Sequence, residues 1–197
     1  MFCKSEDFEF ELARRTIVNL NNIDHQYVQQ KKAGRTDEQI SDVYEVTQLL
    51  NSFIGLLVIP RERFLVYGNT EMPSIFVTEE ARELLKTLNR ERNKPSGRYY
   101  TTYKNGKERL TPWTISRHLR NAISHGSLDI QPKTIEQGSS ITGFSFIDKN
   151  IKTEEEFKLE LTIQEIRLIL IETANLILSH FPQTYRPLKL DYIVLPT

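Results

Sequence analysis

The most informative stretch of the chain reads RHLRNAISHG, from Arg117 to Gly126. Upstream of it, Thr111 and Pro112 form a pair that commonly opens a helix, a threonine cap followed by a proline in the first turn. Gly126 is suited to end the same helix, because glycine readily adopts the left-handed backbone found just past a helix C-terminus. The sequence therefore predicts a short amphipathic helix that carries arginine, histidine, asparagine and serine side chains.

This predicted helix has an apolar arc and a polar arc. At roughly 100° per residue, the apolar side chains fall within an arc of about 100°; they are Ile115, Leu119, Ala122 and Ile123. Arg120 and His125 lie five positions apart, about 140° around the helix, so they flank the polar arc rather than stack on each other. Such a face is typical of a helix surface exposed to water, and the spacing alone does not identify a catalytic site.

Basic residues are concentrated around this helix, although the whole chain is neutral. Lys plus Arg and Asp plus Glu are equal at 26 each. Between Arg90 and Arg120, nine basic residues stand against two acidic ones. A stretch of this kind can attract a phosphate-bearing partner to one place, and it is equally typical of a solvated basic loop.

Cysteine content and hydropathy exclude several classes of protein. The single cysteine, Cys3, cannot form an intramolecular disulfide or a cysteine-based zinc site. No spacing of Asp, Glu and His resembles a metal site, so we expect neither a metal nor a cofactor. The sequence has no run of about 18 apolar residues and no apolar core of a signal peptide, so we expect a cytoplasmic protein without membrane contact.

Apolar residues recur at helical spacing along most of the chain. The pattern predicts helices over residues 8–30 and 36–60, and further helices that begin after the capping residues Thr78, Thr111 and Thr162. The last helix is the most apolar of the set and is expected at the core.

The remaining segments are predicted as strands, turns and loops. Alternating apolar and polar residues predict a two-stranded antiparallel ribbon from Ile141–Asp148 and Glu156–Leu161. A second hairpin is predicted around a turn at residues 104–107, and residues 127–138 are predicted to form a loop.

These elements together predict an all-α fold class, a bundle of about five helices with a small β-hairpin before the last helix. We expect a single domain over residues 1–197. Within it, residues 60–110 include a variable basic loop region, and residues 139–161 form a β-hairpin insertion.

The segment RNAISHG, from Arg120 to Gly126, resembles the signature of HEPN domains, in which an arginine and a histidine are separated by four to six residues. In that family a polar residue commonly follows the arginine, and Asn121 fits this pattern. Residues 44–58 are similar to the second helix of small standalone prokaryotic HEPN proteins, which occur among plasmid-borne, toxin and phage-defence genes. The resemblance covers most of the chain, with residues 60–110 particular to this protein.

The resemblance implies a HEPN-like helical bundle that dimerises through the motif helix, so that two copies form one site for RNA cleavage without a metal. It implies that Arg120 and His125 are the catalytic pair and that Asn121 supports them. The substrate-contact candidates are other polar residues of this helix and cations of the basic stretch, namely Arg117, His118, Ser124, Arg98, Lys104 and Lys107.

The chemistry of these side chains is consistent with that expectation. RNA carries its own nucleophile, the 2′-hydroxyl. Its attack on the adjacent phosphorus needs a proton acceptor, a proton donor for the leaving 5′-oxygen and stabilisation of extra negative charge. Histidine is suited to the proton transfers, and a guanidinium group grips phosphate oxygens while it stays charged. The expected products carry a 2′,3′-cyclic phosphate and a 5′-hydroxyl.

The sequence leaves three functions open. The first is a metal-independent endoribonuclease with a toxin or phage-defence role, which acts on RNA as a homodimer and has an antitoxin or a regulatory protein as a further candidate partner. The second is a non-catalytic HEPN module that binds RNA or a protein partner through the same face. The third is a helical scaffold whose polar helix face only meets water.

Overall fold

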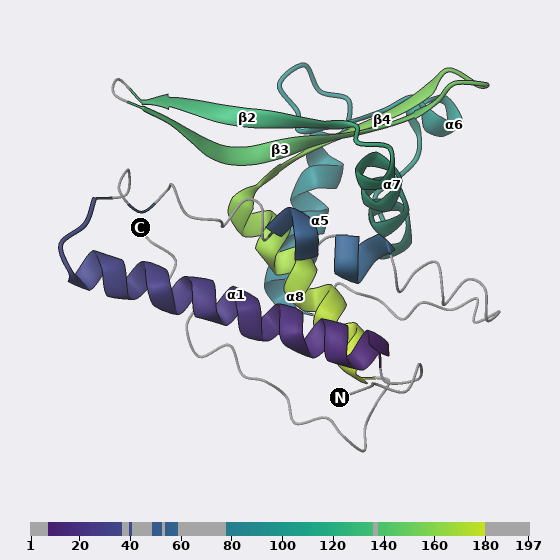
Figure 1. The fold of residues 1–197 in the computed structure, drawn as a ribbon. Coiled ribbons are helices and arrows are strands. Elements are labelled where there is room, and N and C mark those ends of the chain that lie inside the picture. The colour runs from purple at the N-terminus through teal and green to yellow at the C-terminus, as the bar shows by residue number, and fades with distance from the viewer. Residues whose placement is uncertain are drawn as a thin grey trace.

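The computed structural model describes residues 8–36, 40, 49–52, 54–58, 78–135 and 138–179. In this part of the chain, a four-stranded antiparallel sheet lies against a layer of helices (Figure 1). The all-α prediction is therefore wrong, and the protein has a mixed α/β fold. The predicted hairpin is present, but two further strands extend it into a sheet.

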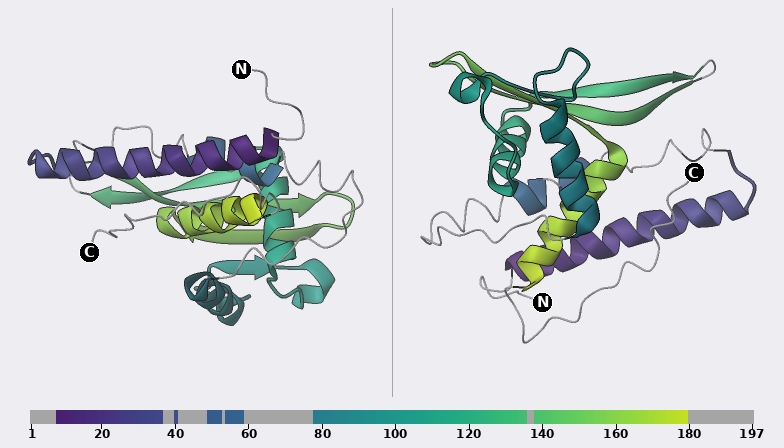
Figure 2. Two further views of the ribbon diagram at one scale, coloured as in Figure 1. Left: turned by 90° about the horizontal axis from the view of Figure 1, so that it is seen from below. Right: turned by 180° about the vertical axis from the view of Figure 1, so that it is seen from behind.

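The helices lie on one side of the sheet. They are α1 (Phe8–Lys32), the π-helical turn η2 (Ile54–Val58), α5 (Glu79–Glu91), the short turn α6 (Tyr103–Gly106), α7 (Pro112–Ser124) and α8 (Ile163–Ser179). Figure 1 shows α5, α7 and α8 beneath the sheet, with α1 crossing α8 on the side away from the sheet. The right view of Figure 2, taken from behind, shows the same order of layers.

The strands follow the order β1-β4-β3-β2, and every neighbouring pair is antiparallel. They are β1 (Tyr99–Thr101), β2 (Leu128–Ile135), β3 (Gly138–Asn150) and β4 (Glu155–Thr162). The predicted ribbon is confirmed as the centre of the sheet, because β3 pairs with β4 along most of its length.

Alternation along β3 and β4 gives the sheet one buried face. Phe157, Leu159 and Leu161 of β4 are fully buried. Phe146 of β3 lies opposite Leu159, and Phe144 lies opposite Leu161. Because side chains two positions apart point to the same face of a strand, these residues form one apolar surface against the helices.

Buried residues of α1, α5, α7 and α8 complete the core. The prediction that the last helix is central is confirmed, since α8 contributes a long series of buried residues, Ile166, Ile169, Leu170, Ala174 and Ile177. From α1, Ala13, Ile17 and Leu20 join the same apolar cluster. No helix among the described residues combines the length and apolar character needed to cross a bilayer.

Three predicted helix starts are confirmed. Thr78 caps α5 by accepting the backbone N–H of Ala81 at 3.3 Å. Thr111 forms a capping box at the start of α7, and Thr162 forms one with Glu165 at the start of α8. Each cap accepts a hydrogen bond from a backbone N–H group of the first helical turn, which has no acceptor within the helix.

The N-terminal helix also matches the prediction. The helix expected over residues 8–30 is α1, which ends two residues later and is followed by Gly34 with φ +79°. The helix expected over residues 36–60 lies largely outside the described residues. Of its described positions, 40 and 49–52 are α-helical, and 54–58 form η2.

The hairpin predicted around residues 104–107 is wrong. β1 pairs with β4 instead of with the segment after the turn, and Tyr99 lies opposite Leu159. The other edge of β1 is occupied by Asn93, whose side-chain amide bonds both the N–H and the carbonyl of Thr101. The turn itself is real, because Lys104, Asn105 and Gly106 all have positive φ, but it lies within α6 and does not join two paired strands.

The loop predicted over residues 127–138 is also wrong, because most of it forms β2. This strand pairs with β3 from Leu128 opposite Phe146 to Ile135 opposite Gly138. The register shifts between Gln131 and Pro132. A proline is tolerated at a bulge on an edge strand, but it interrupts the pattern by which a strand is recognised in sequence.

Candidate functional site

α7 is fixed along one face and at its N-terminal end. The capping box of Thr111 and the proline at the next position define where the helix begins. Ile115, Leu119 and Ala122 are fully buried, and the helix packs against β3 and η2. The apolar arc predicted from sequence is therefore the face that α7 buries, and it holds the helix in a defined orientation.

The C-terminal end of α7 places His125 at the surface. Ser127 donates its backbone N–H to the Ala122 carbonyl at 2.8 Å, and Gly126 donates to the Ile123 carbonyl at 3.1 Å. This Schellman arrangement requires left-handed backbone at Gly126, where φ is +65°. His125 is the capping residue immediately before that turn, and it is exposed.

The other motif residues lie on the last turns of α7. Arg120 and Asn121 are half-buried, whereas Ser124 is exposed beside His125. Asn121 Nδ2 donates to Asp148 Oδ2 of β3 at 2.9 Å. The amide nitrogen of Asn121 thus faces the sheet and connects the motif to it.

A buried histidine lies on α7 just before the motif. His118 is 1% exposed, and its Nδ1 lies 2.6 Å from Asp148 Oδ2. Its Nε2 lies 3.2 Å from Glu108 Oε2 and 2.7 Å from Arg117 Nη2. Because a carboxylate only accepts, Nδ1 donates its proton to Asp148. One oxygen of Asp148 therefore receives hydrogen bonds from both His118 and Asn121.

Opposite charges are paired within this cluster, which we call the His118 network (Glu108, Arg117, His118, Asn121 and Asp148). Arg117 Nη2 donates to Glu108 Oε1 at 2.8 Å, and Glu108 is only 5% exposed. A buried charge costs several kcal/mol unless it is paired and hydrogen-bonded. The network meets both conditions, so it links α7 firmly to β3 and to the segment before α7.

Aromatic rings enclose the His118 imidazole. Phe157 of β4 stacks on it with ring centroids 4.1 Å apart and planes 10° apart. Tyr103 of α6 meets it edge-on at 4.9 Å, and the Arg117 guanidinium lies 5.8 Å from the Tyr103 ring centroid. These contacts hold the imidazole in one orientation, so that Nδ1 stays aligned with Asp148.

The pKa of Asp148 lies below its ordinary value. Burial alone raises the pKa of this carboxyl group, but hydrogen bonds from His118 and Asn121 outweigh it, together with the charges of His118 and Arg117. The folded protein thus favours the carboxylate form, which is the form able to accept both hydrogen bonds.

The His118 network is not arranged as a metal site. The ring nitrogens of His118 and the carboxylate oxygens that face them are already engaged with one another. In the part of the chain that the structure describes, no group of three or more His, Cys, Asp and Glu side chains is placed to hold a metal ion.

The predicted substrate-contact residues fall in different environments. His118 is buried, and Arg117, although partly exposed, is paired with Glu108, so both belong to the network. Arg98 binds both oxygens of Glu165 at 2.7 and 2.8 Å and Glu91 at 3.0 Å, which clamps α5 to α8. The remaining three, Ser124, Lys104 and Lys107, are exposed.

The sequence did not predict two members of the network, Asp148 and Glu108. Asp148 continues the inward positions of Phe144 and Phe146 on β3, and a carboxylate in phase with a buried face is a usable signal. Glu108 is one of two acids in a basic stretch, and no local pattern marks it as buried.

Comparison with known proteins identifies the family of this chain through one family model. No curated protein and no solved structure matches it significantly. One family model, described as HEPN pEK499 p136, matches residues 2–184. HEPN domains are often endoribonucleases, so the match suggests a role in RNA cleavage or nucleotide binding. Because the matched segment spans most of the 197 residues, the resemblance noted in the sequence is confirmed, and the chain belongs to the HEPN pEK499 p136 family.

Proposed function

We propose that the protein is a metal-independent endoribonuclease whose active site forms where the α7 helices of two copies meet. The observation that carries this proposal is the position of the HEPN motif in a chain of that family. His125 is exposed at the end of a helix that is packed along its whole apolar face, and Arg120 lies on the same helix.

In this proposal, Arg120 and His125 are the catalytic residues. His125 takes a proton from the 2′-hydroxyl or delivers one to the leaving 5′-oxygen, a role that typically contributes about 10²–10⁴-fold to a rate. Arg120 grips the non-bridging oxygens as negative charge builds up on phosphorus. The bond that forms joins the 2′-oxygen to phosphorus, and the bond that breaks joins phosphorus to the 5′-oxygen, which leaves a 2′,3′-cyclic phosphate and a 5′-hydroxyl.

Asn121 acts as a positioning residue. Its hydrogen bond to Asp148 ties the turn that carries Arg120 to β3. The same carboxylate holds His118, one turn earlier on the helix. We assign His118 and Arg117 to this support as well, because His118 is buried and the Arg117 guanidinium is paired with Glu108.

A homodimer supplies what one chain lacks. The motif offers a single exposed imidazole per chain, whereas the reaction needs both a general base and a general acid. A two-fold axis beside the exposed end of α7 brings two imidazoles and two guanidinium groups into one cleft. The proposed assembly is therefore symmetric, with α7 facing its own copy.

The proposed substrate is RNA, and the proposed biological role is that of a toxin or a phage-defence nuclease. The resemblance of residues 44–58 to small standalone HEPN proteins supports that role. An endoribonuclease with such a role needs restraint inside its own cell, so we also propose a partner protein, either an antitoxin or a regulator.

Cleavage of total RNA by the purified protein in the presence of EDTA tests the activity. We expect fragments with 5′-hydroxyl ends, detected because a kinase labels them without prior dephosphorylation. His125→Ala and Arg120→Ala should each lower the rate by about 100-fold or more. The matched controls His25→Ala and Arg15→Ala change exposed residues of α1 and should leave the rate unchanged. Loss of cleavage on chelation would rule out the proposed mechanism.

The second candidate is a non-catalytic HEPN module that binds RNA or a protein through the same end of α7. It is favoured by the single exposed imidazole and by the engagement of Asn121 with the sheet. One experiment separates the two candidates. If the protein is a binding module, the immobilised protein retains RNA or a partner protein, but neither the wild type nor any variant produces new RNA ends.

A further inference from the structure

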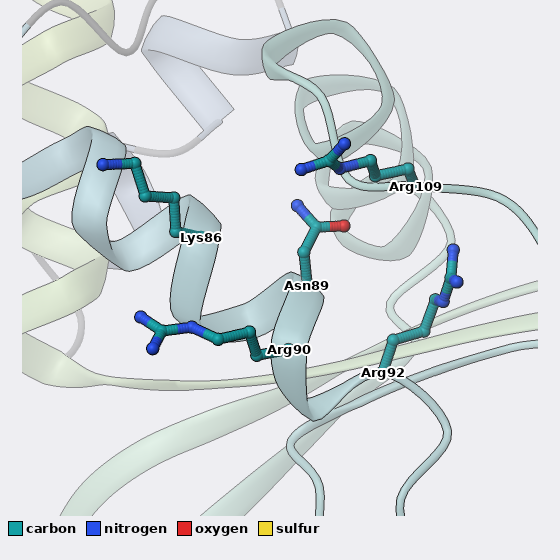
Figure 3. A pocket seen from close by; sticks show the side chains of 5 residues that line it. All are labelled: Lys86, Asn89, Arg90, Arg92 and Arg109. Carbon is teal, nitrogen blue, oxygen red and sulfur yellow. The ribbon is translucent and has the colours of Figure 1, made fainter.

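A pocket lined by cations lies between α5 and the segment that leads into α7. It has a volume of about 470 Å³ and is lined by Lys86, Asn89, Arg90, Arg92 and Arg109 (Figure 3). The pocket lies at the N-terminal end of α7, whereas His125 lies at the opposite end of the same helix. It is therefore separate from the motif.

Asn89 and Arg92 join the two sides of the pocket, which are α5 and the segment of residues 107–110. The Asn89 side chain donates to the carbonyls of Leu85 and Leu110 and accepts the N–H of Leu110, each at 2.9 Å. Arg92 Nη1 donates to the carbonyls of Lys107 and Glu108 at 3.0 and 3.3 Å. These bonds fix the segment that carries Arg109 opposite α5, so that Arg109 and the cations of α5 line one pocket (Figure 3).

The charge of the pocket is only partly compensated. None of its lining residues is acidic. Lys86 pairs with Glu83 on α5, and Arg90 lies 3.9 Å from the same carboxylate. Across the residues that the structure describes, neither Arg92 nor Arg109 has a carboxylate partner. Arg98 and Arg117, by contrast, are neutralised by carboxylates. The pocket thus holds uncompensated guanidinium groups of the basic stretch.

The lining also indicates what kind of anion the pocket binds. It contains no aromatic side chain on which a base stacks, and the amide of Asn89 is fully occupied by backbone groups. Apart from Asn89, every polar group in the lining is cationic, and such groups bind phosphates of any sequence, so we expect recognition by charge. Arginine suits this task, because its planar fork binds phosphate oxygens. The charge of this pocket therefore suits the phosphates of a nucleic-acid backbone.

We infer that this pocket binds the sugar-phosphate backbone of RNA at a distance from the cleaved bond. The inference rests on the proposed function, since it takes RNA as the substrate. α7 has 13 residues, which at 1.5 Å per residue separates the pocket from His125 by about 20 Å. A strand that reaches both places is held several nucleotides away from the reacting phosphate, and the pocket contributes to affinity rather than to chemistry.

The test measures RNA binding by the His125→Ala protein, in which chemistry is blocked. Fluorescence anisotropy of a labelled single-stranded RNA of about 20 nucleotides is recorded over a range of salt concentrations. The pocket variant is Arg90→Gln with Arg109→Gln, and Arg92 is kept because it supports the backbone. The matched control is Arg15→Gln with Arg35→Gln, which removes two exposed arginines from α1 and its end. Circular dichroism establishes that all proteins are folded.

We expect the pocket variant to weaken RNA binding about tenfold or more and the control to leave it nearly unchanged. Each lost phosphate contact lowers the slope of log K against log salt by about 0.7 for a single strand, so the pocket variant should lose about 1.4. DNA of the same sequence should suffer the same loss, because no group in the pocket reads the 2′-hydroxyl.

Several results would overturn the inference. They are equal RNA binding by the pocket and control variants, no RNA binding by any version, and pocket-dependent binding of inorganic phosphate with RNA binding unaffected. The inference and the proposed function also fail separately. Cleavage with pocket-independent binding contradicts only the pocket, whereas pocket-dependent binding without any cleavage contradicts only the nuclease.

Discussion

Asp148 links the motif helix to the sheet through a single oxygen atom. Its Oδ2 accepts from His118 at 2.6 Å and from Asn121 at 2.9 Å, and both donors lie on α7. If the donors are removed, the buried carboxylate is left unpaired, and if the carboxylate is removed, the donors are left unpaired. Either change leaves polar groups without partners in the core. We therefore regard Asp148 as the residue on which the orientation of the motif depends most.

Replacing Asp148 by asparagine should destabilise the protein by about 3 kcal/mol, because it removes the charged partner of a buried network. The effect should also depend on pH. The folded pKa of Asp148 is lowered relative to its usual value of about 3.9, so its contribution is fully present above that value and is lost as pH falls through the lower folded pKa. Urea unfolding at several pH values should thus show the wild type and Asp148→Asn converging in acid.

The exposed Asp129 of β2 provides the matched control for that measurement. Asp129→Asn makes the same chemical change outside the network, so it should cost little at any pH. A constant difference between wild type and Asp148→Asn across the acidic range would contradict the role given to the Asp148 carboxylate.

At the level of elements, the sequence predicts helix starts, which depend on neighbouring residues, but it does not predict strands that depend on distant partners. The caps at Thr78, Thr111 and Thr162 depend on residues within one helical turn, and all three were predicted. β1 and β2 depend instead on partners elsewhere in the sheet. β1 has only three residues and takes its pairing from β4, while β2 contains a proline at a bulge. No local pattern contains that information.

In the candidate site, too, the local features were predicted and those that depend on distant residues were not. The polar arc of α7 was predicted, and so was the end of the helix at Gly126. The sequence did not predict that His118 of this arc is buried while His125 is exposed. This difference in burial arises because β3 brings a carboxylate against α7, and a helical wheel does not show which polar side chain meets such a partner.

Gly126 tests how far the end of α7 determines the site. A side chain at φ +65° is strained by about 1–2 kcal/mol, although nothing lies within 4 Å of the position where its Cβ would be. Gly126→Ala should therefore lower the free energy of unfolding by about that amount. Gly126→Asn should lower it less, because asparagine tolerates left-handed backbone better.

The two Gly126 variants should also differ in RNA cleavage. Gly126→Ala favours continued helix and displaces His125, so its rate should fall further than that of Gly126→Asn. Equal cleavage by the two variants, at unequal stability, would show that the Schellman turn is important only for folding.

At the scale of the whole molecule, the fold presents two different surfaces at the two ends of α7. The cationic pocket lies between α5 and the segment that leads into α7 (Figure 3), and His125 lies at the other end of α7. A symmetric pair that joins through the His125 end keeps both pockets on the outside. In the proposed dimer, one RNA strand would then be bound at a flank and cut at the centre.

A heterodimer of wild-type protein with an Arg120→Ala/His125→Ala chain tests whether the cleft is shared. The two chains are co-expressed with different affinity tags and purified through both, so that every molecule contains one intact motif. If each chain cleaves on its own, this heterodimer retains half of the wild-type rate. If acid and base come from different copies, the rate falls by about 100-fold, the loss typical of one missing proton-transfer group. Size-exclusion chromatography with light scattering on the same sample establishes that two chains are present, so a half-maximal rate would refute the composite site.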